Sequence, residues 1–255
     1  MSARYTVETV TSFHAWTPKL FSFRTTRSSA FRFTAGQFAR LGVAKEDKTV
    51  WRAYSMVSSP YDEELEFFSI MVPGGEFTSE LSHLKVGDSL MVDATAFGFL
   101  TLDRFHDGRD LWLLATGTGI APYLSILNTP DVWQRYDNVV LVYSAREADE
   151  LAYLDTIAGM RRHPLWGAAA ASKLRFVPVV TRERVEGALG HRITDMLLDG
   201  SLESAVGLTI DAAHARLMIC GNPQMVSETR KILQARGLTV SRQSAPGQLA
   251  VEQFW

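Results

Sequence analysis

The sequence predicts two domains, an antiparallel β-barrel over residues 1–103 and a doubly wound parallel α/β domain over residues 104–255. Short apolar segments, often alternating with polar residues and separated by turn residues, fill the first part, as is typical of a small barrel. From Asp110 onward apolar segments alternate with helical ones, which indicates a parallel sheet covered by helices. Polar residues interrupt the apolar pattern at 101–109, so we place the domain boundary there.

Each domain has its own expected elements. Barrel strands are expected at residues 5–10, 20–23, 38–41, 66–72 and 89–93, with a further extended segment within 49–60. One short helix is expected at 78–84, with Thr78 as its N-cap. The α/β strands are expected at residues 111–115, 138–144, 174–180 and 216–219, and the helices at 120–128, 150–160, 191–199 and after Pro223. Residues 167–171, Gly-Ala-Ala-Ala-Ala, are expected to form a loop or a helix end.

The composition excludes several classes of protein. The chain has 255 residues, 46% hydrophobic and 21% charged, which is enough for two modest cores. A formal net charge of −2 argues against nucleic-acid binding and leaves open a local basic patch for an acidic partner. Residues 1–11 lack a secretory pattern, and no apolar run approaches the roughly 20 residues of a membrane span, so we expect a cytoplasmic protein.

Cysteine and histidine, two common metal ligands, are few and scattered. The single cysteine, Cys220, excludes an intrachain disulfide and a four-cysteine iron–sulfur cluster within this chain. The six histidines show no ligand spacing, so no metal site is expected.

The segment Arg52-Ala53-Tyr54-Ser55 has three side chains suited to a bound flavin. Arg52 can pair with a pyrophosphate, Tyr54 can lie against an aromatic ring, and Ser55 can offer a hydroxyl or backbone N–H to a ring nitrogen. On a strand, Arg52 and Tyr54 share one face. Four such residues also fit an ordinary edge strand, so the interpretation depends on the rest of the chain.

Two glycine turns follow in the second domain. In residues 111–123 an apolar strand leads into a Gly-Thr-Gly turn and then a helix with Pro122 in its first turn. A strand, a tight glycine turn and a helix N-terminus can accept phosphates or a nicotinamide ribose. Pro122 stands where the Rossmann fingerprint has its third glycine, so this turn departs from that pattern. Residues 217–225, Leu-Met-Ile-Cys-Gly-Asn-Pro-Gln-Met, repeat the design.

In this order and spacing, the three motifs resemble the ferredoxin/flavodoxin–NADP reductase family over nearly the whole chain. The bacterial single-chain type, whose C-terminus ends in aromatic residues, is most similar, since this chain ends in Gln253-Phe254-Trp255. The resemblance implies FAD in the barrel and NADP in the α/β domain. It also implies a monomer that uses NADPH and binds acidic ferredoxin or flavodoxin transiently, without nucleic acid or membrane.

The resemblance also implies which residues bind FAD. They are Arg52, Ala53, Tyr54, Ser55, Phe68, Ser69, Ile70, Glu76, Phe77, Thr78, Thr118, Ala250, Phe254 and Trp255. Tyr54 would cover one face of the flavin, and Ser55 would lie near N5, the hydride-accepting atom. Thr78 and Glu80 suit plain helix capping equally well.

The NADP residues implied are Thr118, Gly119, Arg146, Arg182, Arg192 and Cys220. The family holds the 2′-phosphate with arginines at the ends of consecutive strands, and three arginines match those positions here. A single arginine is usually a solvated surface cation. An NAD site would instead place an acid at the ribose hydroxyl, and Glu147, Asp149 and Glu150 could supply one. Three matching arginines favour NADP.

Tyr54, Ser55 and Cys220 are the residues expected at the reacting atoms. Cys220 would position the nicotinamide, because hydride transfer requires no covalent intermediate; the alternative is a small buried hydrophobe. In the tail, Ala250 would approach the exposed face of the flavin and Trp255 would stack on the adenine. Alternatively, Phe254 and Trp255 pack on the core.

The function expected is hydride exchange between NADPH and FAD, with single electrons passed to or from ferredoxin or flavodoxin. An NADPH-dependent flavin or quinone reductase, or the reductase component of an oxygenase, shares the same sequence features. A nucleotide-binding electron-transfer subunit without its own catalysis is a third reading, but related subunits of that kind carry an iron–sulfur cysteine cluster, which this chain lacks.

Overall fold

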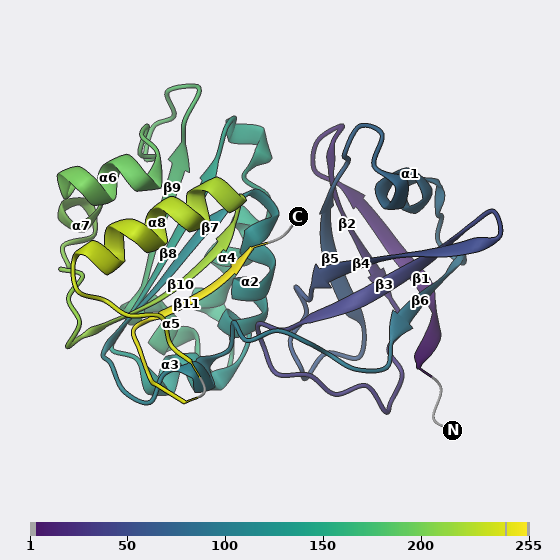
Figure 1. Cartoon of the computed structure of the whole chain (residues 1–255), viewed down its shortest axis with the longest axis horizontal. Coiled ribbons are helices and arrows are strands. Elements are labelled where there is room, and N and C mark those ends of the chain that lie inside the picture. Colours follow the sequence, from purple (N-terminus) through teal and green to yellow (C-terminus); the bar gives the residue numbers. More distant parts are fainter. Residues whose placement is uncertain (1–3, 243, 254–255) are drawn as a thin grey trace. The chain divides into compact units, whose positions relative to one another are not determined.

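The structure of the chain, a computed structural model, describes residues 4–242 and 244–253. The chain divides into two compact units (Figure 1). The first runs to Thr101 and includes Ala121–Ile126, and the second contains Leu102–Ile120 and the chain from Leu127 onward. The domain boundary after residue 103 stays a prediction.

An antiparallel six-stranded sheet, in the order β4-β3-β6-β1-β2-β5, forms the first unit. Its strands are β1 (Tyr5–Ala15), β2 (Leu20–Thr25), β3 (Phe38–Lys45), β4 (Lys48–Ser55), β5 (Leu65–Ile70) and β6 (Ser89–Asp93). The sheet curls until its edges approach, since Met56, directly after β4, bridges to Phe67 in β5. Both side chains are fully buried in the enclosed core. The predicted antiparallel barrel is confirmed.

A five-stranded parallel sheet, in the order β11-β10-β7-β8-β9, forms the second unit. Its strands are β7 (Asp110–Thr116), β8 (Asn138–Ala145), β9 (Leu174–Val180), β10 (Ala215–Gly221) and β11 (Leu249–Gln253). Helices lie on both faces of this sheet, with α6, α7 and α8 in front of it in Figure 1 and α4 and α5 behind. Covering both faces explains why every residue of β10 is buried. The predicted doubly wound sheet is confirmed.

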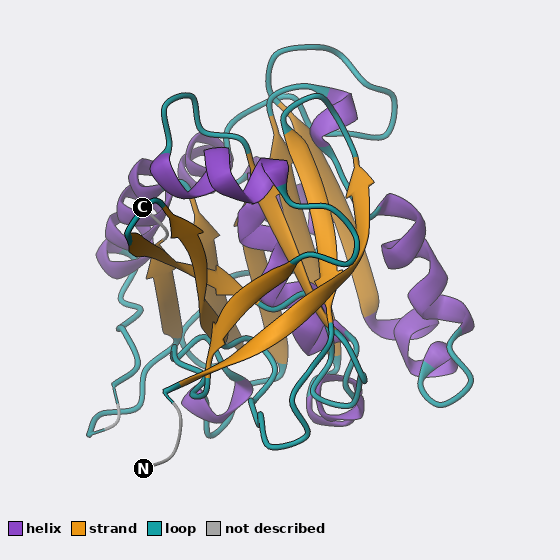
Figure 2. Cartoon of the chain, turned by 90° about the vertical axis from the view of Figure 1, so that its right-hand side faces the viewer, coloured by secondary structure: helices purple, strands orange, loops and turns teal. Residues whose placement is uncertain are grey.

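The helices, shown in purple in Figure 2, are short. The α-helices are α1 (Glu76–His83), α2 (Ala121–Leu127), α3 (Pro130–Arg135), α4 (Leu154–Gly159), α5 (Gly167–Lys173), α6 (Ile193–Asp199), α7 (Ser201–Val206) and α8 (Pro223–Ala235). The 3₁₀ turns are η1 (Leu102–Arg104), η2 (Gly117–Ile120), η3 (Ala148–Glu150) and η4 (Met160–Arg162). Apolar faces of α6, α7 and α8 pack with the sheet in one core.

Two local predictions in the second unit were wrong, and one strand was missed. The helix expected at 150–160 is interrupted at Tyr153, whose φ of 64° is left-handed, so α4 begins only at Leu154. Residues 167–171 form most of α5, beginning at its N-terminal end, rather than a loop or only a helix end, because alanine is the best helix former. The tail adds β11 in parallel beside β10, from Leu249 opposite Leu217.

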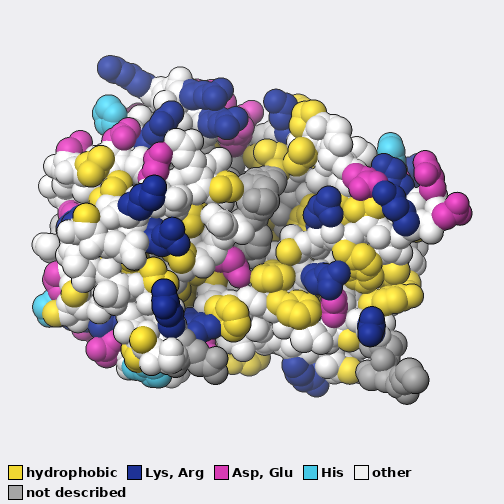
Figure 3. All heavy atoms as spheres, viewed as in Figure 1, with side chains coloured by type: hydrophobic (Ala, Val, Ile, Leu, Met, Phe, Trp, Pro, Cys, Tyr) yellow, Lys and Arg dark blue, Asp and Glu magenta, His cyan; other side chains and the backbone are white. Residues whose placement is uncertain are grey.

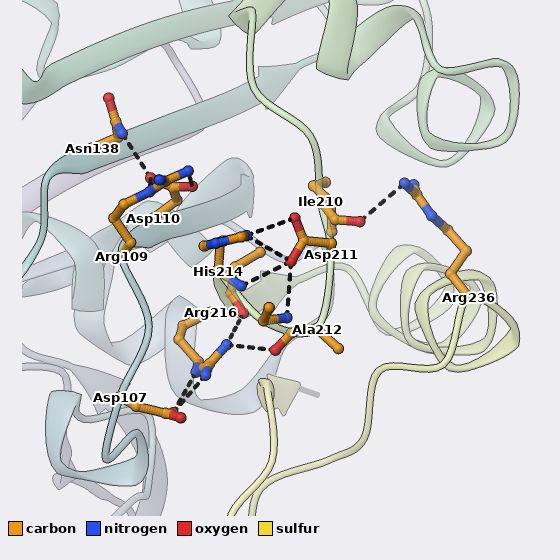
Figure 4. A network of polar contacts seen from close by, with 12 residues as sticks. Asp107, Arg109, Asp110, Asn138, Ile210, Asp211, Ala212, His214, Arg216 and Arg236 are labelled. Carbon is orange, nitrogen blue, oxygen red and sulfur yellow. Dashed lines mark hydrogen bonds and ion pairs between the residues drawn. The ribbon is translucent and has the colours of Figure 1, made fainter.

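Polar residues fix the edge of the parallel sheet where its strands begin (Figure 4). Arg216, 2% exposed, donates to Asp107 Oδ1 from Nε (3.1 Å) and Nη2 (2.5 Å). It also donates to the carbonyls of Ala212 (3.1 Å) and Ala215 (2.6 Å). Gly108 has a φ of 100°, and a Cβ there would come within 2.4 Å of Arg216 Cγ. The hydrogen bonds of the buried Arg216 guanidinium therefore hold this edge of the sheet together.

Candidate active site

Arg52 and Tyr54 lie on the same face of β4, where both pair with buried residues of β3. Arg52 is exposed, and among the described residues its guanidinium donates to the Trp51 carbonyl (2.8 Å). Ala53, between them, is exposed on the opposite face. Ser55 is 5% exposed, and its hydroxyl has no hydrogen-bond partner among the described residues. A buried polar atom without a partner costs free energy, so this hydroxyl suits a ligand atom.

The phenol of Tyr54 reaches across from β4 to the opposite edge strand, β5. Its hydroxyl lies 2.9 Å from the hydroxyl of Ser69, and its ring centroid lies 5.4 Å from that of Phe77. Burial raises the pKa of Tyr54 to about 12, so the phenol stays protonated. These contacts fix the plane of the ring, which suits it to stacking against a flat cofactor. Phe68 and Ser69 are buried and Ile70 is half-buried at the end of β5.

Helix α1 begins at Glu76, and its N-cap is Gly75. The prediction of Thr78 as N-cap was wrong, because Thr78 lies in the first turn and its hydroxyl accepts from the Val72 N–H (3.3 Å). No side chain caps α1, so the N–H groups of its first turn are open to an anion. Lys48 pairs with the Glu76 carboxylate and holds its pKa below the usual range, so phosphate binding by Glu76 would use its backbone.

Two glycine turns at the carboxyl ends of β7 and β10 approach each other closely. Thr118 and Gly119 lie in η2, directly after β7. A Cβ at Gly119 would come within 2.5 Å of the Cys220 carbonyl oxygen, and one at Gly221 within 2.2 Å of Thr116 Oγ1. Only glycine permits this approach at both positions. Thr118 and Cys220 are thereby brought to one edge of the sheet.

Cys220 is fully buried at the penultimate position of β10. Burial raises the pKa of its thiol well above the ordinary value, and the nearby Glu252 carboxylate raises it further. The thiol is therefore neutral, which suits packing or positioning and not nucleophilic attack.

Thr116 and Asn222 also shape these turns, and the sequence reasoning missed both. The Thr116 hydroxyl accepts from the Asn222 N–H at 2.8 Å. The Asn222 side chain caps α8 by accepting from the N–H groups of Gln224 (2.9 Å) and Met225 (3.3 Å). An Asn-Pro pair opening a helix is a capping signal that could have indicated Asn222.

Arg146 and Arg182 follow the neighbouring strands β8 and β9. The Arg182 N–H donates to the Arg146 carbonyl at 3.0 Å, so the structure brings the two residues together. Both are exposed, and no hydrogen bond or ion pair of either guanidinium is found among the described residues. Arg192 is the N-cap of α6, and no described contact joins it to the other two. Lys and Arg side chains gather over the loop after β9 (Figure 3).

Two of the three acidic residues beside Arg146 bind backbone groups. Glu147 and Glu150 form a capping box around η3, in which each carboxylate accepts from the backbone N–H of the other residue. Glu150 Oε2 also accepts from the Arg146 N–H at 3.0 Å. The sequence pattern Glu-x-x-Glu carries this signal, because a capping box places an acid three residues after the cap.

Two family models match the chain, one over each predicted domain. Residues 9–98 match an oxidoreductase FAD-binding domain, and residues 113–231 match an oxidoreductase NAD-binding domain. A ferredoxin–NADP reductase of Pseudomonas aeruginosa is 44% identical, over 99% of this chain and 98% of the relative. The chain belongs to the ferredoxin/flavodoxin–NADP reductase family.

Other relatives agree with this membership. A flavodoxin/ferredoxin–NADP reductase of Rhodobacter capsulatus is 38% identical, over 96% of this chain and 91% of the relative. A crystal structure of a ferredoxin–NADP reductase from Neisseria gonorrhoeae, with bound FAD and NADP, has a TM-score of 0.92 at 38% identity and full coverage of both chains. The resemblance inferred from the motifs is confirmed, as are the FAD and NADP cofactors implied by it.

Parts of the expected site of this family member lie deep in the sheet or outside the described residues. Ala250 is 5% exposed within β11, beside Met218 of β10. Phe254 and Trp255 lie outside the described residues. The roles of all three toward FAD stay predictions.

The part of the chain that the structure describes contains neither a membrane-spanning helix nor a cluster of metal-binding side chains. Within residues 4–242 and 244–253, no helix is long and apolar enough to span a membrane. In the same ranges, no three His, Cys, Asp or Glu side chains group closely enough to hold a metal ion.

Proposed function

We propose that this chain is an FAD-dependent oxidoreductase that transfers a hydride between NADPH and FAD and single electrons to or from ferredoxin or flavodoxin. The observation that carries the proposal is the buried Ser55 hydroxyl, which has no described protein partner, within residues that match the FAD-binding family. Bound FAD supplies the conversion between two-electron and one-electron transfer.

The residues of the first unit fit FAD by charge and shape. Arg52 has an exposed guanidinium that can pair with the pyrophosphate, and the uncapped start of α1 offers backbone N–H groups to the same phosphates. Tyr54, held by Ser69 and Phe77, stacks on the flavin ring. Ser55 donates to the ring nitrogen that accepts the hydride.

The charge distribution beside β8 and β9 supports NADP over NAD. Arg146 and Arg182 lie together with unpaired guanidiniums among the described residues, which suits a 2′-phosphate. The NAD alternative needs a carboxylate free for the ribose hydroxyl. Of the three acids considered, Glu147 and Glu150 are engaged in the capping box, which leaves the exposed Asp149 for that role. Arg192 is proposed as a third contact to the same phosphate.

Thr118, Gly119 and Cys220 are proposed to place the nicotinamide. Gly119 lets η2 approach the Cys220 carbonyl, so a planar ring can lie against backbone without a side chain in between. The neutral Cys220 thiol contributes contact and excludes water, and it forms no covalent bond with the substrate.

The proposal also includes the protein that accepts the electrons, the oligomeric state and the cellular location. We expect transient binding of an acidic ferredoxin or flavodoxin by a monomeric, cytoplasmic reductase. A flavin or quinone reductase, or an oxygenase reductase component, remains the second candidate because those enzymes share the motifs.

Acceptor kinetics separate the candidates. The purified protein, reduced anaerobically with NADPH, would be mixed in turn with ferredoxin, flavodoxin, free flavin and a quinone. The proposal expects reoxidation by ferredoxin or flavodoxin at micromolar concentration to exceed reoxidation by the small acceptors at the same concentration. Faster reoxidation by free flavin or quinone would favour the second candidate.

A further inference from the structure

Three consecutive backbone N–H groups after β8 donate to carboxylates. Glu150 Oε2 accepts from Arg146 (3.0 Å) and Glu147 (3.3 Å), and Glu183 Oε1 accepts from Ala148. A run of N–H groups of this kind can bind an anion, and here the anions are the protein's own side chains. The segment that carries Arg146 is therefore held at each residue by a charge-assisted bond.

Glu183 differs from Glu150 because it comes from the other segment. Glu150 lies within the segment it binds, whereas Glu183 follows Arg182 after β9. Beyond the strand ends, the two segments are also joined by backbone bonds from Thr181 to Ala145 (3.2 Å) and from Arg182 to Arg146 (3.0 Å). The Glu183 carboxylate adds a third bond between the two segments. It accepts from the Ala148 N–H, at positions that follow both arginines in the sequence.

The charge and the hydrogen bond of Glu183 act in opposite directions on a bound phosphate. As a negative charge beside two exposed arginines, Glu183 weakens the attraction of that site for an anion. As an acceptor for Ala148, it holds the two arginine-bearing segments at a fixed separation, which lowers the ordering cost of binding. The sign of the effect of removing Glu183 therefore reveals which of the two dominates.

We propose that Glu183 is a positioning residue for the 2′-phosphate of NADP, because its bond to the Ala148 N–H reinforces the backbone bond that joins Arg182 to Arg146. This inference rests on the proposed NADP function. Glu183 itself does not touch the nucleotide.

Three variants of the purified, FAD-loaded protein test the proposal. Glu183→Ala removes the charge and the bond, Glu183→Gln removes the charge but keeps an acceptor, and Glu186→Ala removes a charge from the same exposed loop. No hydrogen bond of Glu186 is found among the described residues, so this variant is the matched charge control. Calorimetric titration would give the dissociation constants of adenosine 2′,5′-bisphosphate and of 5′-AMP.

Glu183→Ala should weaken binding of the 2′,5′-bisphosphate by about 5-fold, roughly what one hydrogen bond supplies. Glu183→Gln should stay within about twofold of wild type, and Glu186→Ala should bind equally or more tightly, since each loses a negative charge. In turnover, Glu183→Ala should raise KM for NADPH and leave kcat unchanged.

Equal or tighter binding by Glu183→Ala would show that charge dominates and would overturn the proposal. So would a Glu183→Gln variant as weak as Glu183→Ala, because the acceptor would then give no rescue. If the wild type itself bound the 2′,5′-bisphosphate no better than 5′-AMP, the NADP assignment would fail, and the positioning role with it. Wild-type preference combined with an unaffected Glu183→Ala overturns the positioning role alone.

Discussion

The backbone N–H of Asn222 donates to the Thr116 hydroxyl at 2.8 Å and thereby joins the end of β7 to the start of α8. A Cβ on Gly221 would come within 2.2 Å of the same hydroxyl oxygen, which is too close for any side chain. One threonine therefore controls both the position of the helix cap and the path of the second glycine turn. Since Cys220 precedes that turn, Thr116 also sets the backbone against which we place the nicotinamide.

Thr116→Val should raise KM for NADPH by a fewfold, because it keeps the side-chain shape but leaves the Asn222 N–H without its acceptor. We also expect the free energy of unfolding to fall by about 0.5–1.5 kcal/mol. Steady-state kinetics and denaturant unfolding measure the two effects. Thr116→Ser, which retains the hydroxyl, is the control, and a KM for the valine variant equal to that of wild type would argue against this role.

Ser55→Ala should slow flavin reduction by NADPH roughly 2- to 10-fold, as one hydrogen bond to the reacting ring would predict. With FAD removed, the same variant should be no less stable than wild type, because the Ser55 hydroxyl has no described protein partner to lose. Stopped-flow reduction and unfolding of the FAD-free protein measure these outcomes. A variant destabilised without FAD but reduced at the normal rate would assign Ser55 to the fold alone.

Arg182→Ala should raise KM for NADPH by roughly 5- to 150-fold, corresponding to about 1–3 kcal/mol for a partly desolvated charged contact. NADH lacks the 2′-phosphate, so the ratio of kcat/KM for NADPH to that for NADH should fall by the same factor. Parallel assays with both nucleotides measure this ratio. An unchanged ratio would remove Arg182 from the nucleotide site and return attention to the acidic residues near Glu147.

Tyr136→Phe should leave the free energy of unfolding at pH 7 equal or slightly higher, because the fully buried Tyr136 hydroxyl has no hydrogen-bond partner among the described residues. Burial raises the Tyr136 pKa from 10.0 to about 12, so the folded state retains the proton more strongly than the unfolded chain. Ionisation of Tyr136 therefore leaves the free energy of unfolding unchanged below about pH 10 and lowers it as pH rises toward about 12.

The loss of stability at high pH tests the raised pKa of Tyr136. Denaturant unfolding between about pH 10 and about pH 12, the window between the two pKa values, should show a shallower loss of stability in Tyr136→Phe than in wild type. Tyr61→Phe, at a side chain that is 70% exposed, is the control for removing a tyrosine hydroxyl. Identical slopes for Tyr136→Phe and wild type would contradict the assigned shift.

Gly108→Ala should destabilise the second unit, because the left-handed φ of 100° costs an alanine about 1–2 kcal/mol and its Cβ would displace the buried Arg216. Gly87→Ala provides a matched comparison, since its φ is 97° and no atom lies within 4 Å of the added Cβ. Thermal or denaturant unfolding should show the larger loss for Gly108→Ala. Equal losses would mean that only the backbone, and not the packing of Arg216, matters there.

The sequence predicted the two sheets because the patterns of apolar and polar residues along their strands differ. The continuous apolar run of β8 gives a strand buried on both faces, whereas β1 mixes polar and apolar residues and is only partly buried, with Glu8 buried and Val7 exposed. It failed where tertiary contacts decide local structure. The left-handed turn at Tyr153 has no glycine to signal it, and β11 forms only because β10 offers an open edge.

The candidate site likewise contains positions that the sequence predicted and contacts that it could not predict. The motifs around Arg52 and Gly119 predicted positions that depend on backbone type and strand alternation, which a sequence shows directly. The partners of Thr116 and Glu183 could not be predicted, because each bond joins segments that are distant in the chain or follow different strands. A cap at Thr78 was expected from its residue type, but Gly75 occupies that position because the turn after β5 places the helix start earlier.

The central claim is that one FAD per chain is reduced directly by NADPH. The most direct measurement is the FAD content of the purified protein, followed by anaerobic titration of its flavin absorbance with NADPH and, separately, with NADH. The account predicts about one non-covalently bound FAD per chain, bleached by one equivalent of NADPH much faster than by NADH. A protein that cannot be loaded with FAD, or a bound flavin that NADPH does not reduce, would contradict it.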